Sequence, residues 1–460
     1  MHYILLLILT LFTILFRLVF DLSYYDLQRF ILLLFVTYVA IYFVRNKRRN
    51  VPVTRSLIAF CAIFFIGVIS TVVNGHITTG LSEVLHFSIL IFTAIILSAG
   101  FNNKDVGKFI YRFSVIFVSL YVIYFFVGYA SHLSNSFSPL WPAKNLFSLN
   151  QFPGIIISDT LLFSYVRFFN HIQTWTFPLL ISGILITHNR RNKVILFVLL
   201  SIWWALLIQS GGRGTLLSIT VALAAVLIFI PKNRKKRAIT YFGSFLSGAG
   251  LYLLMFLTIS TPVRELTRQG MSGRLDMWEK AWLMFVENPL FGNGPLSYSF
   301  IENSQLYFAH PHNFYLQVLS EWGILAFIIL TTLIFYGLFF LFKKVKQETN
   351  SKMMEMNIGL TVSLVAALLH AGLSQIFHTP ISQIFLVLVL AWVFRYLAED
   401  VQAMKIKNSF LAITSLVSIL IFLFLNSSNM KNSFKGYGDY IEKYQTNELY
   451  PRIWSQGLNE

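Results

Sequence analysis

The sequence contains a single cysteine and is poor in charged residues. Cys61 has no second cysteine with which to form an internal disulfide or a cysteine-based metal cluster. Asp, Glu, Lys and Arg make up only 12% of the 460 residues, about half of the roughly 25% that is usual in soluble domains. These shortages exclude a disulfide-stabilised secreted domain, a disordered chain and a soluble enzyme.

Long apolar runs take the place of the missing charges. Hydrophobic residues make up 56% of the chain and aromatic residues 17%. The runs are continuous, unlike the alternating segments of about ten residues in membrane barrels, and approach the roughly 20 residues that a membrane-spanning helix needs. The sequence therefore predicts an all-α, polytopic membrane protein with about 12–13 transmembrane helices. The candidate runs cover about residues 3–20, 27–44, 56–73, 84–100, 109–129, 158–187, 194–210, 214–230, 238–258, 323–342, 357–376, 381–397 and 409–425.

The basic residues that give the chain its net charge of +17 are clustered between the apolar runs. They follow every even-numbered run, as the positive-inside rule requires when the N-terminus is cytoplasmic. No basic face remains for nucleic acid, and none is expected as a partner. We expect one integral membrane domain, residues 1–460, with a large outer loop at 259–322 and a short outer tail at 426–460.

The positive-inside rule disfavours Lys and Arg in outer segments, so each arginine on the predicted outer side needs a specific explanation. Arg213 lies in the glycine-rich stretch Gln209–Thr215, where exposed backbone N–H groups and a guanidinium suit a phosphate or diphosphate. We include Gly212 among the candidate substrate contacts. The alternative is an arginine that extends to the interface from a helix end.

A second outer arginine, Arg274, opens an amphipathic segment in the large loop. The segment ends at Asn288-Pro289, and its apolar stripe comprises Leu275, Trp278, Trp282 and Phe285. This pattern predicts an interfacial helix whose aromatic face lies in lipid or against the bundle. Arg264 and Arg268 precede it, and either contact the substrate or touch lipid headgroups.

His312 follows Pro311, and Asn313 can cap the helix after it. An imidazole accepts a proton near neutral pH, so His312 is the candidate general base, although a purely structural histidine would fit the same place. His310 is expected to matter little. Glu321 is a further candidate contact, and its spacing from the histidines matches no known metal-ligand pattern, so we expect no metal or cofactor.

Few ionisable residues lie within the apolar runs. Glu83 and His86 are three residues apart and are expected to pair with each other. A transporter or flippase would instead place charges around a central cavity. This distribution favours an enzyme whose site lies in the outer loops.

Three features together resemble the O-antigen ligase and polymerase superfamily of bacterial envelopes. His312-Asn313, followed by nine residues and Gly323, resembles its His-Asn motif. Arg213 with Leu217 resembles its outer arginine motif, and the stretch Pro289–Gly294 follows an arginine-bearing helix as in the family. The resemblance covers about residues 190–345. Ala326 departs from it, because ligases usually have Gly, Thr or Tyr there.

The resemblance implies a fold like the GT-C glycosyltransferases and an active site on the periplasmic face of the bacterial inner membrane. It implies transfer of a glycan from undecaprenyl diphosphate to an acceptor hydroxyl, with inversion and without metal. Arg213 and Arg274 would stabilise the diphosphate and His312 would deprotonate the acceptor. The acceptor is the lipid A core in a ligase, which we favour, a second lipid-linked glycan in a polymerase, or a protein hydroxyl in an O-oligosaccharyltransferase.

Overall fold

The computed structural model describes ten segments of the chain. These are residues 23–45, 50–53, 55–100, 103–133, 166–231, 233–256, 273–300, 309–398, 404–434 and 452–454. The chain divides into two compact units. Unit 1 comprises Met1–Val19, Gly107–Gln269 and Val345–His370, and unit 2 comprises Phe20–Val106, Gly270–Lys344 and Ala371–Glu460.

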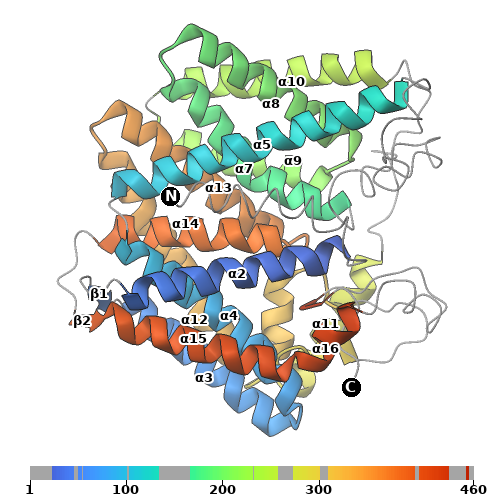
Figure 1. Cartoon of the computed structure of the whole chain (residues 1–460), viewed down its shortest axis with the longest axis vertical. Helices are drawn as coiled ribbons and strands as arrows, with labels where there is room; N and C mark the ends of the chain where they lie inside the picture. Colours follow the sequence, from blue (N-terminus) through green and yellow to red (C-terminus); the bar gives the residue numbers. More distant parts are fainter. Residues whose placement is uncertain are drawn as a thin grey trace. The chain divides into compact units, whose positions relative to one another are not determined.

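The described structure is helical, as predicted (Figure 1). The helices whose residues lie wholly or mostly in unit 1 are α5 (Asn103–Leu133), α7 (Val166–Ile186), α8 (Arg190–Gln209), α9 (Arg213–Phe229), α10 (Arg234–Phe256) and α13 (Ser351–Ala371). Those in unit 2 are α2 (Tyr24–Arg45), α3 (Arg55–Asn74), α4 (Ile77–Gly100), α11 (Arg274–Glu287), η3 (Ser297–Phe300), α12 (Phe314–Gln347), α14 (Pro380–Ala398), α15 (Asn408–Leu425) and α16 (Ser427–Phe434).

The helices confirm a polytopic membrane protein. Among the described residues, eight helices are long and apolar enough to cross a bilayer, and α9 and α15 are shorter apolar helices. Twelve of the thirteen predicted runs coincide with a helix, while the run at 3–20 lies outside the described residues. Several boundaries differ by five residues or more: for example, α12 begins at Phe314 rather than near residue 323, α4 begins at Ile77 rather than near residue 84, and α13 ends at Ala371 rather than near residue 376.

One short ribbon was not predicted. β1 (Asn50–Val53) pairs antiparallel with β2 (Met404–Lys407), so that Asn50 lies opposite Lys407 and Val53 opposite Met404. The ribbon joins the connections that follow α2 and α14, both of which carry basic residues. Each strand is only four residues long and β1 contains Pro52, so the sequence signal for this ribbon is weak.

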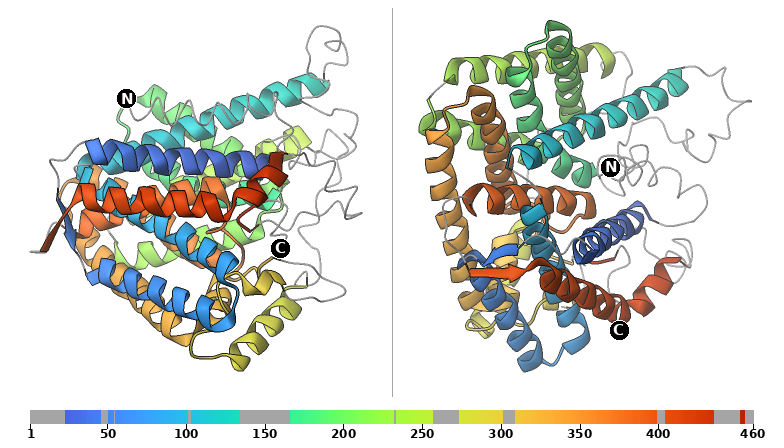
Figure 2. Two further views of the ribbon diagram at one scale, coloured as in Figure 1. Left: turned by 60° about the horizontal axis from the view of Figure 1, so that its bottom comes forward. Right: turned by 60° about the vertical axis from the view of Figure 1, so that its left-hand side comes forward.

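In unit 2, α4 packs against α14, α15 and α3, and α2 packs against α15 and α4 (Figures 1 and 2). In unit 1, α8 packs against α10 and α7, and α7 also packs against α9. Within unit 1, a buried ion pair joins α10 to α13: Arg237 Nε donates to Glu355 at 3.0 Å. The same guanidinium donates to the Ile230 carbonyl at 3.0 Å.

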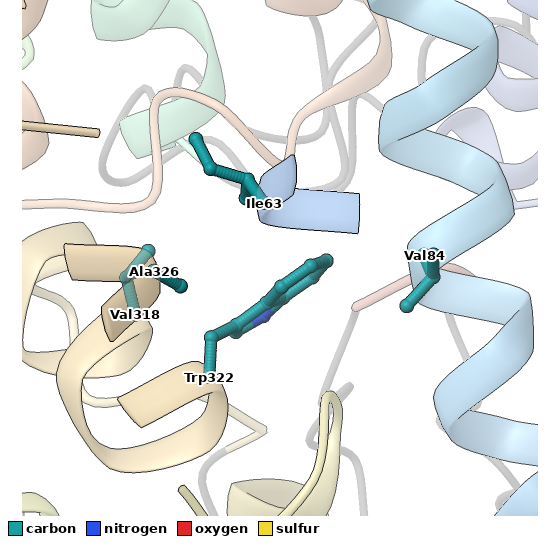
Figure 3. Packing of buried hydrophobic residues seen from close by; sticks show 5 residues of the cluster. All are labelled: Ile63, Val84, Val318, Trp322 and Ala326. Carbon is teal, nitrogen blue, oxygen red and sulfur yellow. The ribbon is translucent and has the colours of Figure 1, made fainter. Parts of the chain in front are cut away.

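A tight apolar cluster in unit 2 fixes α12 against α3 and α4. The indole of Trp322 lies between Ile63 and Val84, and Val318 and Ala326 complete the cluster (Figure 3). Ala326, the position that departs from the family pattern, is fully buried. A side chain added at Gly67 of α3 would overlap the Trp322 ring, so this contact requires a glycine.

Candidate functional site

Arg213 is the first residue of α9, in unit 1. Gly211 has φ 62°, a left-handed conformation that suits glycine, and Gly212 is the N-cap without a side-chain hydrogen bond. The Arg213 side chain is exposed. The turn therefore combines a guanidinium with the N-terminal end of a helix that has no side-chain cap, a combination that attracts anions.

Buried polar side chains hold this turn in place. Asn170 Nδ2 donates to Ser210 Oγ at 2.6 Å, and the Thr215 hydroxyl donates to the Asn170 carbonyl at 2.9 Å. Thr174 Oγ1 is 2.7 Å from His370 Nδ1 and 3.1 Å from the Thr215 hydroxyl. A Cβ at Gly212 would overlap the side chain of Asn170, so the turn is fitted closely to α7.

Arg274 is the first residue of α11, in unit 2, after Gly273 with φ 68°. The buried side chains of α11 show which face of this helix packs against the rest of unit 2. Its buried residues are Met277, Ala281 and Met284, with Ala281 and Met284 packed against Tyr298 of η3. Leu275 and Trp282, on the predicted aromatic stripe, are 58% and 51% exposed, so that part of the stripe points away from the bundle.

His312 is 6% exposed and has φ 53°, in the left-handed region. Asn313 caps α12 as predicted, since its Oδ1 accepts from the N–H groups of Tyr315 and Leu316 at 3.1 and 3.2 Å. The turn is also bound to α11, because Trp278 Nε1 donates to the Pro311 carbonyl at 3.1 Å. The structure thus links the arginine-bearing helix to the histidine turn.

His310 contacts the histidine turn more closely than its place outside the motif suggested. Its Nδ1 accepts from the backbone N–H of His312 at 3.2 Å, and the two rings lie edge to face with centroids 4.3 Å apart. The His310 ring also stacks on that of His378 at 6.0 Å. His310 therefore supports the backbone of the candidate base.

The Gly323 of the motif interrupts α12. It has φ 78° and ψ 177°, and a Cβ there would overlap the Leu290 carbonyl. The interruption redirects backbone hydrogen bonds to the stretch Pro289–Gly294: the N–H groups of Asn293 and Gly294 donate to the Ser320 and Glu321 carbonyls, each at 3.0 Å, and Ile324 N donates to the Pro289 carbonyl at 2.9 Å. The two sequence motifs therefore form one interlocked structure.

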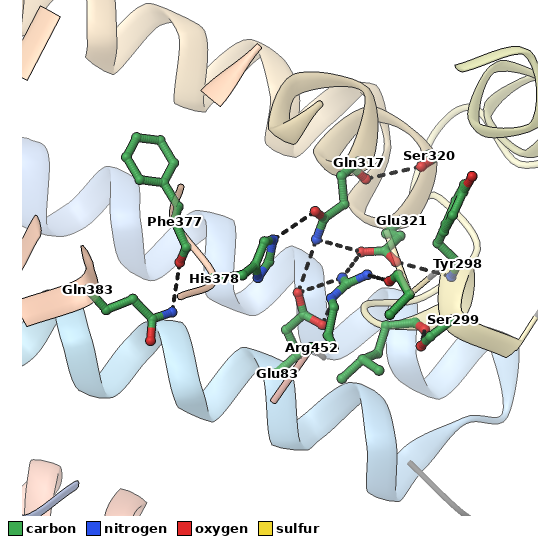
Figure 4. A network of polar contacts seen from close by, with 12 residues as sticks. Glu83, Tyr298, Ser299, Gln317, Ser320, Glu321, Phe377, His378, Gln383 and Arg452 are labelled. Atoms are coloured by element: carbon green, nitrogen blue, oxygen red, sulfur yellow. Dashed lines mark hydrogen bonds and ion pairs between the residues drawn. The ribbon is translucent and has the colours of Figure 1, made fainter. Parts of the chain in front are cut away.

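The carboxylate of Glu321 lies in a buried polar network of unit 2 (Figure 4). It accepts from the backbone N–H of Tyr298 at 3.1 Å and from Gln317 Nε2 at 3.2 Å. Arg452, from the C-terminal tail, donates to Glu321 at 2.5 Å and to Glu83 at 2.8 Å. Two carboxylates from separate helices thus share one guanidinium.

The predicted pairing of Glu83 with His86 is wrong. Glu83 pairs with Arg452, whereas His86 Nε2 contacts Arg29 at 3.0 Å and Gln383 at 3.1 Å. Arg29 also donates to Gln383. A separation of three residues places Glu83 and His86 on one side of α4, but separate partners from other segments bind them.

The charges of the network affect groups outside the spans. Burial disfavours the charged form of Arg452, but the nearby Glu321 and Glu83 outweigh it, and the pKa of Arg452 is raised above its ordinary value. Burial, reinforced by the charge of Glu321, raises the pKa of the Tyr298 hydroxyl. Both groups therefore keep their protons at neutral pH.

The predicted site residues fall into three groups. His312, Asn313, Glu321 and Arg274 lie in unit 2, in or beside one set of contacting elements. Arg213 and Gly212 belong to unit 1. Arg264 and Arg268 lie outside the described residues.

Sequence reasoning missed three residues of the unit 2 network. Arg29, Arg452 and His378 are buried there, and His378 Nε2 contacts Gln317 Oε1 at 2.8 Å. Arg29 gave a weak signal, as a charge within an apolar run. Arg452 gave none, because a single arginine in a polar tail resembles any solvated residue.

Comparison with known proteins agrees with the motifs. Residues 179–331 match the family described as O-Antigen ligase, a range that includes the Arg213 turn, α11 and the His312 motif. No curated protein matches the chain. The family match over part of the chain supports the O-antigen ligase and polymerase superfamily indicated by the motifs, and with it a glycosyl-transferring membrane enzyme.

Proposed function

We propose that this protein transfers a glycan from undecaprenyl diphosphate to an acceptor hydroxyl at the periplasmic face of the bacterial inner membrane. The observation that carries the proposal is the buried turn at His312, bound both to the arginine-bearing helix and to Glu321's helix inside the O-antigen ligase domain. Of the three acceptor classes, we favour the lipid A core.

The two arginines suit the leaving group. Cleavage of the bond between the sugar's anomeric carbon and the diphosphate leaves negative charge on the departing undecaprenyl diphosphate. Arg213 and Arg274 each open a helix after an N-cap glycine that provides no side-chain cap. Each position therefore offers a guanidinium together with backbone N–H groups, which stabilise phosphate oxygens without a metal ion.

His312 suits the other half of the reaction. The acceptor hydroxyl forms the new bond to the anomeric carbon, and its proton passes to the imidazole as the old bond breaks. Attack from the face opposite the leaving group inverts the anomeric carbon. Arg264, Arg268, Gly212, Asn313 and Glu321 are the proposed contacts that orient the two substrates.

The test is turnover by the purified full chain in detergent. A labelled undecaprenyl-diphosphate glycan is supplied with lipid A core, with a second lipid-linked glycan, or with a pilin-type protein, in separate reactions. We expect transfer to the lipid A core, unaffected by EDTA. Transfer to another acceptor would reassign the subclass, and inhibition by EDTA that Mg²⁺ or Mn²⁺ reverses would contradict the metal-free mechanism. Transport in sealed vesicles without any transfer would favour a flippase.

Orientation is tested separately with reporter fusions to the full chain. Because Lys and Arg cluster after every even-numbered run, we expect alkaline phosphatase to be inactive at Lys235 and Lys346 and active after Glu460. Active phosphatase at Lys235 or Lys346 would reverse the proposed orientation. Inactive phosphatase after Glu460 would remove the predicted thirteenth span.

A further inference from the structure

Residues 452–454 of the C-terminal tail are buried in unit 2. Arg452, Ile453 and Trp454 are each no more than 2% exposed. The indole Nε1 of Trp454 donates to Asn426 Oδ1 at 3.0 Å. A polar tail would be expected to stay in solvent, so burial of these three residues indicates a specific docking site within the unit.

Other buried side chains hold the backbone of this tripeptide. Arg29 Nε donates to the Ile453 carbonyl at 2.9 Å, and the Tyr25 hydroxyl donates to the Arg452 carbonyl at 2.6 Å. Arg29 also donates to the His378 carbonyl at 2.8 Å, and the Tyr25 hydroxyl oxygen lies 3.1 Å from the same carbonyl oxygen. The same two side chains therefore bind both the tail and the segment that carries His378.

The Arg452 guanidinium reaches from the tail to the histidine motif. Its Nη1 donates to the Ala309 carbonyl at 2.7 Å, three residues before His312. Its Nη2 donates to Glu321, nine residues after His312, and to Glu83 of α4 (Figure 4). One planar group thus fixes a point on each side of His312 against α4.

The trio carries more negative than positive charge. Counting both carboxylates as ionised, Glu83 and Glu321 with one guanidinium sum to −1. A buried ion pair stabilises a fold little more than apolar packing of the same volume. To neutralise one carboxylate, Arg452 would need to contact that carboxylate alone. It instead donates hydrogen bonds to the Ala309 carbonyl, Glu83 and Glu321, which lie on separate segments. The geometry therefore fits a residue that sets positions better than one that only balances charge.

We propose that Arg452 is a positioning residue, which holds the His312 turn and Glu321 in the arrangement needed for transfer, so that the C-terminal segment completes the site. The inference rests on the proposed function, in which His312 is the base. Arg452 acts through Ala309 and Glu321. Loss of its hydrogen bonds would displace the imidazole, and a displacement of about 1 Å can cost about 10²-fold in rate.

The experiment compares full-chain variants at matched folded protein. Arg452→Lys keeps the charge but loses the planar fork. The double variant Arg452→Gln/Glu83→Gln keeps the formal charge of the trio at −1, because it removes one charge of each sign. We measure melting temperature, donor Kd, and kcat and KM for the acceptor. We expect the double variant to melt near the wild type, bind donor normally, and show kcat lower by about 10 to 10²-fold.

Arg452→Lys is expected to lower kcat about tenfold or more with an unchanged donor Kd, since misplacement of the base acts on the chemical step. Arg237→Lys is the matched control, because Arg237 is an equally buried, ion-paired arginine in unit 1. Its kcat per folded protein should not change. A wild-type kcat together with a wild-type melting temperature in the double variant would show that Arg452 only neutralises charge. If the double variant does not fold, normal kcat in Arg452→Lys would overturn the proposal.

A second readout does not depend on transfer. Modification of His312 by diethyl pyrocarbonate, followed by mass spectrometry, should be severalfold faster in the Arg452 variants, because the buried turn loosens. It should be unchanged in Arg237→Lys. If the wild type transfers no glycan, the proposed function fails while this measurement still decides the role of Arg452. Equal modification rates in all chains would contradict the positioning role.

Discussion

Replacing His312 with alanine is expected to lower the rate of glycan transfer by about 10² to 10⁴-fold, the usual contribution of a general base. The donor should still bind, because the diphosphate is assigned to the arginines. His312 has a left-handed backbone, which Asn also tolerates. His312→Asn is therefore the better-controlled variant: it preserves the turn but cannot accept the proton. Donor Kd and acceptor-transfer rates are measured for both variants at matched folded protein.

His310→Ala is the companion variant. His310 accepts a hydrogen bond from the His312 backbone, so its loss should lower kcat less than the loss of His312 itself. Near-normal transfer by His312→Asn would show that the imidazole is not the base. Loss of donor binding by that variant would instead make His312 a diphosphate ligand, and the base would then be sought at Glu321 or Asp276.

The sequence predicted the helical architecture because its signals are local. Each apolar run long enough to span a membrane has few alternatives to a helix, since backbone polar groups in lipid must be satisfied within the segment. Twelve runs accordingly coincide with helices. The boundary errors arise where apolar composition is not the deciding factor. Asn313 starts α12 through a side-chain cap, and the chain remains helical from there despite the interruption at Gly323.

The candidate site was only partly predictable, because its contacts join distant segments. The cap at Asn313 and the amphipathic helix that carries Arg274 follow from nearby residues, and both were recognised. The two motifs Pro289–Gly294 and His312–Gly323 were recognised separately, but their shared backbone hydrogen bonds emerge only in the fold. Arg452 lies 369 residues from Glu83. No spacing rule covers such a separation, so the pairing of Glu83 could not be derived from its own helix.

Replacing Arg213 or Arg274 with alanine is the second change expected to have a large effect. Each should lower transfer by at least about 10² to 10³-fold, the cost of removing one fixed group that stabilises developing negative charge. Unlike the His312 variants, these should also weaken donor binding, because the diphosphate is already charged before the bond breaks. Lysine at either position should restore transfer only partly, since a point charge lacks the bidentate fork.

The matched control for the arginines is Arg190→Ala. Arg190 is also an exposed first residue of a helix, α8, but its helix start is capped by the Asn189 side chain, which accepts from the N–H groups of Arg191 and Asn192. Arg190 follows an even-numbered run and is therefore predicted to lie on the cytoplasmic side, away from the donor, and the N–H donors at this helix start are already satisfied. Transfer and donor Kd should therefore match the wild type. If Arg190→Ala reduced transfer as strongly as Arg213→Ala, the loss would reflect general surface charge. If Arg213→Ala and Arg274→Ala kept normal donor affinity and rate, the diphosphate would have to be bound elsewhere.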